Sequence, residues 1–311
     1  MKKRSMVLNQ GLVLASLAAG MVLAAEGRIP IYQQTTIATP GKYVVTRNLS
    51  TAAAPLIDIQ VSNVDIDLNG MELRSTSTTD PVVRTSGGGV SIRNGKIVGG
   101  NEGILLAGVE GGTIEGNEIR SSAGAGIALT GTRNVAVLDN RLNRPGGSGI
   151  LISGSGGNLI SGNTMNEPIG DGIKLESSSS SNRVSGNLIL GASGNGIYLS
   201  HSQNQINYYN RIDNNHVVST GGSAALRVES TSNYIEGNTL HRTPNGWGIW
   251  FKPTADSTAG GNVYQRNTAR DNSGSGCTGT TGSGGTADLC DEATTSNVSG
   301  GDNFVPGPPP S

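Results

Sequence analysis

The chain has 311 residues, of which 14% are charged, and its formal net charge is −1. Such a balance lacks the basic surplus of a nucleic-acid-binding protein, so nucleic acid is excluded as a partner. The 48 glycines do not indicate disorder, because apolar residues recur at a fixed interval between them.

Residues 1–25 have the features of an export signal. Residues 1–4 are basic, residues 12–23 are apolar but too short to span a bilayer, and small residues follow at Ala24 and Ala25. We expect cleavage near these alanines, which makes the mature protein secreted or periplasmic and leaves it without a membrane contact. An uncleaved anchor is the alternative.

Two phrases repeat in step about every 23 residues, which is the signature of a solenoid. The first is Gly-Ile-x-Leu, which begins at Gly103, Gly126, Gly149, Gly172, Gly196 and Gly248, with a looser copy at Ala225. The second is Asn-x-φ-x-Gly-Asn-x-φ, where φ is apolar, and its second Asn stands at positions 117, 140, 163, 187, 215, 238 and 267. Short alternating runs separated by Gly and Asn predict strands and not helices.

These repeats predict an all-β fold, a single-stranded right-handed parallel β-helix of about nine coils over residues 63–272. Residues 26–62 are predicted to form an N-terminal capping segment. The recurring Asn is interpreted as a stacked amide ladder in a turn, because Asn tolerates the left-handed conformation and bonds its neighbours' backbone. A monomer is expected.

Residues 273–311 lack the repeat and are rich in Gly and Pro. They hold the two cysteines of the chain, Cys277 and Cys290, which an oxidising compartment is expected to pair as a disulfide. Two thiols make a poor metal site unaided, and the histidines show no metal-ligand spacing. We expect no metal and no cofactor, although a calcium ion held by Glu176 or Glu229 stays open.

The start of the mature chain carries a family resemblance. Residues 39–45 (TPGKYVV), 48–50 (NLS), 57–59 (IDI) and 64–70 (VDIDLNG), followed by the Gly-Asn-x-Ile coils, resemble secreted right-handed β-helix repeat proteins. That group includes the pectate-lyase-like superfamily and the carbohydrate-binding and sugar-hydrolysis domains related to NosD. The resemblance covers roughly residues 36 to 272 and implies the fold and an extracellular polysaccharide partner.

The residue motifs of particular enzymes in that group are not found. The Trp-x-Asp-His and Arg-x-Pro-x-x-Arg segments of pectate lyases and the Asp-Pro-His-Asp segment of mannuronan epimerases are absent. The sequence around Asp171, Gly170-Asp171-Gly172, matches the Gly-Asp-Asp motif of polygalacturonases only partly.

The repeat also assigns residues to the outer face. In Gly-Ile-x-Leu the Ile and Leu point inward, so x points to solvent. The first three x positions are apolar, whereas the last four are Lys174, Tyr198, Arg227 and Trp250. The next outward position includes Glu176, Glu229 and Lys252, and Trp247 is expected on the same face, with Phe251 inward. Two insertions, residues 201–209 and 252–261, leave the same corner and could wall a groove.

Four functions are compatible with this face. A carbohydrate-binding protein would stack sugars on Trp247, Trp250, Tyr198 and Tyr208, with Lys174, Arg227, Lys252 and Asp171 as polar contacts. A lyase or epimerase would use Lys174, His201 or Tyr198 as the base and Arg227 to neutralise a uronate carboxylate. A hydrolase would use Glu176 and Glu229, two rungs or about 9.6 Å apart. The fourth is a scaffold whose polar face is only solvated. Binding of a polysaccharide that contains uronate is the favoured hypothesis, and a lyase is favoured over a hydrolase if the protein is catalytic.

Overall fold

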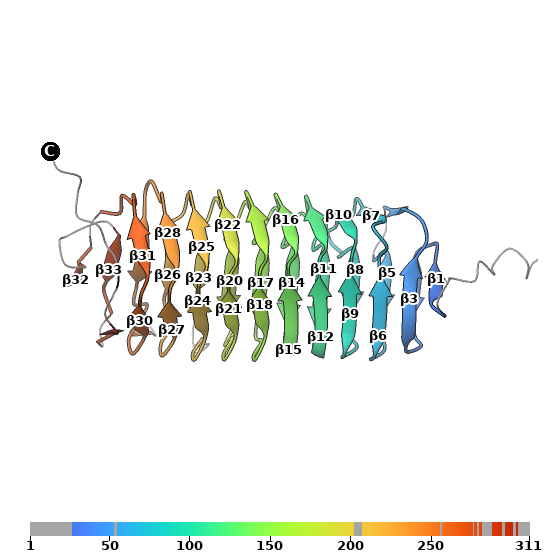
Figure 1. Ribbon diagram of the computed structural model, residues 1–311, viewed down its shortest axis with the longest axis horizontal. Coiled ribbons are helices and arrows are strands. Elements are labelled where there is room, and N and C mark those ends of the chain that lie inside the picture. The colour runs from blue at the N-terminus through green and yellow to red at the C-terminus, as the bar shows by residue number, and fades with distance from the viewer. Residues whose placement is uncertain are drawn as a thin grey trace, which may run out of the picture.

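The computed structural model describes residues 27–52, 55–201, 207–255, 257–275, 277–278, 280–281, 288–293, 296–300 and 303. The predicted export signal, residues 1–25, lies outside the described residues. The described chain is an elongated stack of coils with its two ends at opposite ends of the axis (Figure 1). Within these residues, no helix has the length and hydropathy of a membrane-spanning segment.

A complete coil contributes one strand to each of three sheets, named here A, B and C. Sheet A contains β1 (Ile29–Ile31), β3 (Gly41–Val45), β6 (Val64–Asp67), β9 (Val90–Arg93), β12 (Glu110–Glu115), β15 (Arg133–Leu138), β18 (Leu159–Ser161), β21 (Arg183–Ser185), β24 (Arg211–Asp213), β27 (Tyr234–Glu236), β30 (Val263–Gln265) and β34 (Val298–Ser299). Sheet B contains β2 (Thr35–Ile37), β5 (Ile57–Ile59), β8 (Val83–Thr85), β11 (Ile104–Ala107), β14 (Ile127–Thr130), β17 (Ile150–Ser153), β20 (Ile173–Glu176), β23 (Ile197–Leu199), β26 (Ala224–Val228), β29 (Trp247–Phe251), β33 (Leu289–Asp291) and β32 (Thr280–Thr281). Sheet C contains β4 (Leu49–Thr51), β7 (Glu72–Ser75), β10 (Lys96–Gly99), β13 (Glu118–Arg120), β16 (Arg141–Asn143), β19 (Thr164–Asn166), β22 (Leu188–Leu190), β25 (His216–Val218), β28 (Thr239–His241) and β31 (Thr268–Arg270).

The predicted parallel β-helix is confirmed. Nine strands of sheet A, β6 to β30, lie within residues 63–272. The register places Ile104 beside Ile127, Ile127 beside Ile150, and Ile150 beside Ile173, so the 23-residue period is the length of one coil. These isoleucines are all 0% exposed and belong to one continuous core. Residues 26–62, expected as a cap, contribute β1 to β5 to the same three sheets.

The glycine that precedes each of these core residues is required by close packing of the coils. A Cβ added at Gly172 would lie 2.5 Å from the backbone oxygen of Gly196, in the next coil. No side chain fits at that separation, so the repeated Gly reflects coil stacking at this position.

The recurring Asn forms the predicted amide ladder between sheets A and C. Asn163 is 0% exposed; its Nδ2 donates to Asn187 Oδ1 at 3.0 Å, and its own Oδ1 accepts from Asn140 Nδ2 at 3.0 Å. A second ladder, not predicted, runs along the corner where the chain enters sheet A. Its members are Asn158, Asn182, Asn210, Asn233, Asn262 and Asn297.

The C-terminal segment closes the solenoid. β33 continues sheet B beside β29, and β34 continues sheet A beside β30. β32 then pairs with β33 in the antiparallel direction, whereas the other strand pairs of the described chain are parallel. The predicted disulfide between Cys277 and Cys290 is present. It joins the chain just before β32 to β33.

Reduction of this disulfide is expected to loosen the C-terminal coils selectively. The bond closes a loop of 13 residues, and a crosslink of that length contributes about 3 kcal/mol to stability. Both tryptophans of the chain lie in β29, so their fluorescence reports on this end. We expect denaturation followed by fluorescence to shift to lower denaturant with reductant, and a Cys277→Ser/Cys290→Ser variant to be insensitive to reductant. Equal midpoints in both conditions would contradict the prediction.

Candidate functional site

Four neighbouring strands of sheet B each place one charged or aromatic residue on the outer face. The register pairs Lys174 of β20 with Tyr198 of β23, Tyr198 with Arg227 of β26, and Arg227 with Trp250 of β29. This confirms that the four predicted residues form one row, named here the cation–aromatic ladder. The three strands before it carry apolar residues at the same position, Leu105, Ala128 and Leu151.

Cations and aromatic rings are in contact along the ladder. The Arg227 guanidinium carbon lies 5.0 Å from the centre of the Tyr198 ring and 5.3 Å from that of Trp250. At the two ends, Lys174 Nζ lies 5.7 Å from the Tyr198 ring, and Lys252 Nζ lies 4.7 Å from the Trp250 ring. These separations are in the range of cation–π attraction. The predicted contact residue Lys252 therefore belongs to the same cluster.

Two carboxylates, those of Glu229 and Glu176, bond to members of the cation–aromatic ladder and hold them in place. Glu229 pairs with the Arg227 guanidinium, and the Tyr198 hydroxyl donates to Glu229 Oε2 at 2.6 Å. Lys174 pairs with Glu176 at 2.8 Å. Glu229 was expected to face solvent, but it is only 4% exposed. The outward direction of Glu229 was predicted correctly. Its exposure was not, because Arg227 and Tyr198 bond to it and cover it.

The hydroxyl of Tyr198 is held in its protonated form. Burial, and then the hydrogen bond to Glu229, raise the pKa of Tyr198 above its ordinary value. At neutral pH the hydroxyl is therefore a donor to Glu229 and not a base. The hydrogen bond gives Tyr198 the role of a donor that holds Glu229 in the ladder.

His201 lies at the same corner, and its ring nitrogens are unpaired within the part of the chain that the structure describes. Its backbone amide donates to Glu229 Oε2 at 3.4 Å, and its side chain is nearly covered, with 9% of the residue exposed. Among the residues that the structure describes, neither Nδ1 nor Nε2 has a hydrogen-bond partner. Because a buried polar group without a partner is costly, this imidazole is the candidate base with the clearest unmet bonding capacity.

Trp247 lies outside the solenoid core, in one cluster with Trp250, but it is covered there. It is 6% exposed and packs against Ala224 and Cys290. The backbone of Gly274 lies so close that a Cβ there would be 2.5 Å from the Trp247 ring. The prediction that Trp247 is a sugar platform was therefore wrong, because the disulfide-bonded tail covers it. Phe251 is fully buried, as expected.

Asp171 and Tyr208, the two remaining predicted contact residues, lie away from the ladder row. Asp171 Oδ1 accepts from the backbone amide and the side-chain Nδ2 of Asn195, at 2.7 and 3.0 Å, so it has a role in holding the coil corner. Tyr208 is 42% exposed and lies on the side of the corner that leads into sheet A. Asp171 is thus assigned a structural contact, whereas the Tyr208 ring is available at the surface.

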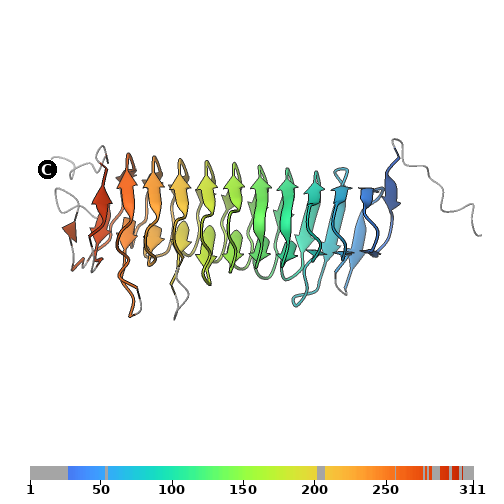
Figure 2. The same ribbon diagram turned by 90° about the horizontal axis from the view of Figure 1, so that it is seen from below.

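The two predicted insertions both connect sheet B to sheet A, after β23 and after β29, so they leave the same corner. The segment after β29 projects beyond the regular coils (Figure 2). Most of the first insertion, residues 202–206, lies outside the described residues.

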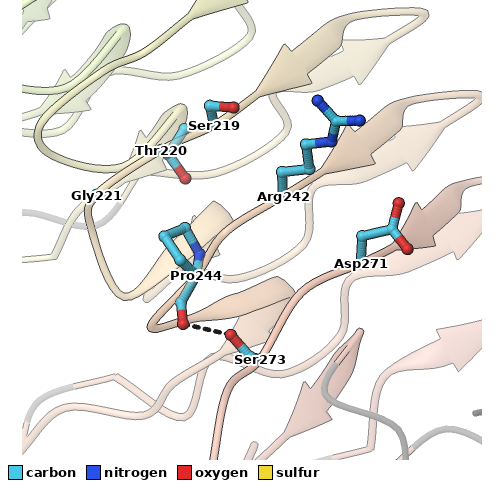
Figure 3. A pocket seen from close by; sticks show the side chains of 7 residues that line it. All are labelled: Ser219, Thr220, Gly221, Arg242, Pro244, Asp271 and Ser273. Atoms are coloured by element: carbon cyan, nitrogen blue, oxygen red, sulfur yellow. Dashed lines mark hydrogen bonds between the residues drawn. The ribbon is translucent and has the colours of Figure 1, made fainter.

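A cavity of about 470 Å³ lies at the other edge of sheet B, where chain segments arrive from sheet C. Arg242 and Asp271 reach the same side of it from successive coils, and Pro244 also lines it, as Figure 3 shows. This cavity was not predicted from the sequence. Its residues stand in connections between strands, for which the repeat assigns no face.

A second cavity of about 480 Å³ lies on sheet B near its N-terminal end. Asp58 and Arg84 line it and form a two-pronged ion pair, with Nε–Oδ1 at 2.8 Å and Nη2–Oδ2 at 2.9 Å. These residues occupy the same outward row as Lys174. That shared position is the signal by which the sequence could have revealed them.

Comparison with known proteins identifies the family. The family model described as "Right handed beta helix region" matches residues 82–240, just over half of the 311-residue chain. A search of curated proteins found no significant match.

Several solved structures share the fold at low sequence identity. The Dettilon tailspike protein is 15% identical with a TM-score of 0.70, and the match covers 89% of this chain and 59% of the tailspike chain. An alginate lyase from a Paenibacillus species is 15% identical with a TM-score of 0.58, covering 86% of this chain and 94% of the lyase. The DFA-IIIase of Arthrobacter chlorophenolicus A6 is 15% identical with a TM-score of 0.60, covering 86% and 77%. This chain thus spans less than two thirds of the tailspike protein.

Proposed function

The chain belongs to the right-handed β-helix family, and from this premise we propose that it binds an extracellular polysaccharide on the outer face of sheet B. The observation that carries the proposal is the cation–aromatic ladder. Four adjacent strands present a cation or a ring in strict alternation, at a repeat of about 4.8 Å set by strand spacing. A linear polymer lying along the solenoid axis would meet these groups in succession.

The chemistry of the ladder suits a sugar polymer that carries carboxylates. Aromatic rings offer flat apolar faces to the C–H groups of sugar rings, and Trp250 is partly exposed beside Lys252. Lys252 makes no ion pair within the described residues, so it can pair with an added carboxylate. The resemblance of the fold to an alginate lyase, an enzyme named for a uronate polymer, supports this choice of ligand. The export signal predicted at residues 1–25 would place binding outside the cytoplasm.

Hydrolysis by Glu176 and Glu229 is not favoured by the geometry. A glycosidase needs two carboxyl groups that reach the bond to be cleaved. Glu229 is covered, and both of its oxygens are used by Arg227 and Tyr198. Its role is therefore to hold the ladder, and binding is proposed ahead of hydrolysis.

Replacing Trp250 with alanine is expected to weaken binding to uronate polymers about tenfold, equivalent to about 1.4 kcal/mol. The variant removes the partly exposed ring on β29, the last strand of the ladder, while leaving Arg227 and Glu229 in place. We would measure dissociation constants for alginate, polygalacturonate and neutral dextran by calorimetry. Leu105→Ala is the matched control, because Leu105 occupies the same outward row on β11, outside the ladder. Undiminished binding by Trp250→Ala would contradict the proposal.

A lyase is the second candidate function, favoured by the His201 imidazole, whose nitrogens have no partner among the described residues. The backbone amide of His201 donates to Glu229. Such an enzyme removes the proton at C5 of a uronate while a cation neutralises the carboxylate. The same incubations, followed by the absorbance of unsaturated products, test it. Absorbance that rises with the wild type and not with His201→Ala would establish the lyase, and a flat trace on every uronate polymer leaves binding alone.

A further inference from the structure

One corner of nine successive coils has a left-handed backbone. Where the chain turns into sheet A, nine successive coils have a residue with φ between +56° and +69°. Eight of the nine are Asn, Gly or Ser, the types that adopt this conformation most easily. They are Asn63, Gly89, Gly111, Asn134, Gly157, Ser181, Ser232 and Gly261, and the ninth is Tyr209.

The Tyr209 side chain is not part of the core at this corner. A bulky aromatic residue at φ +56° is strained. Burial does not compensate, because Tyr209 is 68% exposed. A residue that is locally unfavourable and projects into solvent points to a role at the surface.

Tyr209 forms a pair with Tyr208. The two rings are perpendicular, with centres 5.1 Å apart, and Tyr208 is 42% exposed. Their backbone is fixed in the stack, because Ser181 N donates to Tyr208 O at 3.1 Å and Tyr209 N donates to Ser232 O at 3.1 Å. The pair is therefore a preformed aromatic surface on a rigid corner.

Fixed cations follow directly along the chain. Arg211 begins β24 two residues after Tyr209, and its guanidinium carbon lies 4.9 Å from the Tyr234 ring of the next coil. Arg183, in the preceding coil, shares the Asp213 carboxylate with Arg211, and that carboxylate side chain is 0% exposed. About half of each arginine side chain remains exposed, 52% and 47%. Rings and guanidinium groups thus occur together on the sheet A side of the corner.

We propose that Tyr208 and Tyr209 form a second carbohydrate subsite, at which a sugar ring stacks on the exposed tyrosines and its carboxylate or hydroxyl groups contact Arg211 or Arg183. The subsite lies around the corner from the cation–aromatic ladder, on sheet A and not on sheet B. The inference rests on the proposed function, because it takes the same uronate polysaccharide as its ligand.

The test is Tyr209→Asn, compared with Ser232→Asn, the same replacement at the same corner position of the next coil. Asn occupies this position at Asn63 and Asn134, so neither variant should lose thermal stability, and Tyr209→Asn should keep or raise the melting temperature. Affinity for alginate or polygalacturonate is expected to fall about fivefold or more in Tyr209→Asn and to stay unchanged in Ser232→Asn. Tyr209→Phe, which retains the ring, should restore most of the affinity.

Two results would overturn the inference. One is full affinity in Tyr209→Asn while Trp250→Ala is impaired, which leaves the ladder as the binding surface and removes the subsite. The other is a fall in melting temperature in Tyr209→Asn with binding lost in proportion, which makes the ring a structural element. If the wild type is retained by none of the polymers, both the proposed function and the subsite are rejected.

Discussion

Replacing Asn163 with alanine is expected to lower the free energy of unfolding by about 4 kcal/mol, because several buried polar groups lose their partners at once. Asn163 Nδ2 donates to the carbonyl of Val137 at 2.9 Å, and Asn163 Oδ1 accepts from the backbone amide of Asn140 at 3.0 Å. Alanine supplies neither group and leaves a cavity in the stack. Since each coil is stabilised by its neighbours, the loss should appear in the unfolding of the whole solenoid.

Guanidinium denaturation followed by circular dichroism measures this effect. Asn166→Ala is the matched control, three residues along the chain, where the amide lies on the outer side of sheet C and bonds Asn143. That change should cost less than about 1 kcal/mol. Equal losses for the two variants would show that the buried amide ladder contributes no more to stability than the outer Asn143–Asn166 pair.

Replacing Glu229 with alanine is expected to lower the free energy of unfolding by about 3 kcal/mol, because it leaves a largely covered guanidinium without its counter-ion. The Arg227 side chain is 20% exposed and that of Glu229 is 6% exposed. The Tyr198 hydroxyl loses its acceptor in the same variant. We therefore expect polysaccharide affinity to fall as well, since the ladder loses the group that fixes two of its members.

Glu229→Gln and Glu176→Ala distinguish this structural role from catalysis. Glutamine still accepts from Tyr198 but does not neutralise Arg227, so it should recover only part of the lost stability. Glu176 forms a partly exposed pair with Lys174, and its removal should cost less than about 1 kcal/mol. A Glu229→Gln protein of unchanged stability that had lost cleavage of a polysaccharide would support the hydrolase hypothesis instead.

The parts of the fold that repeat could be predicted from the sequence, because the same local chemistry recurs in each coil. The inward Ile and Leu columns, the Asn ladder and the row from Lys174 to Trp250 all follow from counting positions along a 23-residue period. The alternation of a strand fixes which way a side chain leaves the backbone. It does not fix what covers that side chain, so residues whose exposure depends on distant segments could not be predicted.

Trp247 and Glu229 show the two ways in which this happened. Trp247 is covered by the tail, which has no repeat and so has no predicted position. Glu229 points outward as expected, but Arg227 and Tyr198 close over it through contacts between coils. Tyr209 was missed for a related reason, because it stands in a turn where no face is assigned. Its signal was available only after the nine corners were aligned by structure.

The antiparallel pairing of β32 with β33 bears on how the molecules behave at high concentration. A stack of parallel strands ends in an open edge, and an open edge can be extended by another molecule into a fibre. In sheet B that edge is occupied by a strand running the opposite way, tethered close by through Cys277. A second solenoid cannot continue the parallel register across it. The reversed strand thus protects sheet B at this end against head-to-tail polymerisation, the principal aggregation hazard of a solenoid built from one repeating coil.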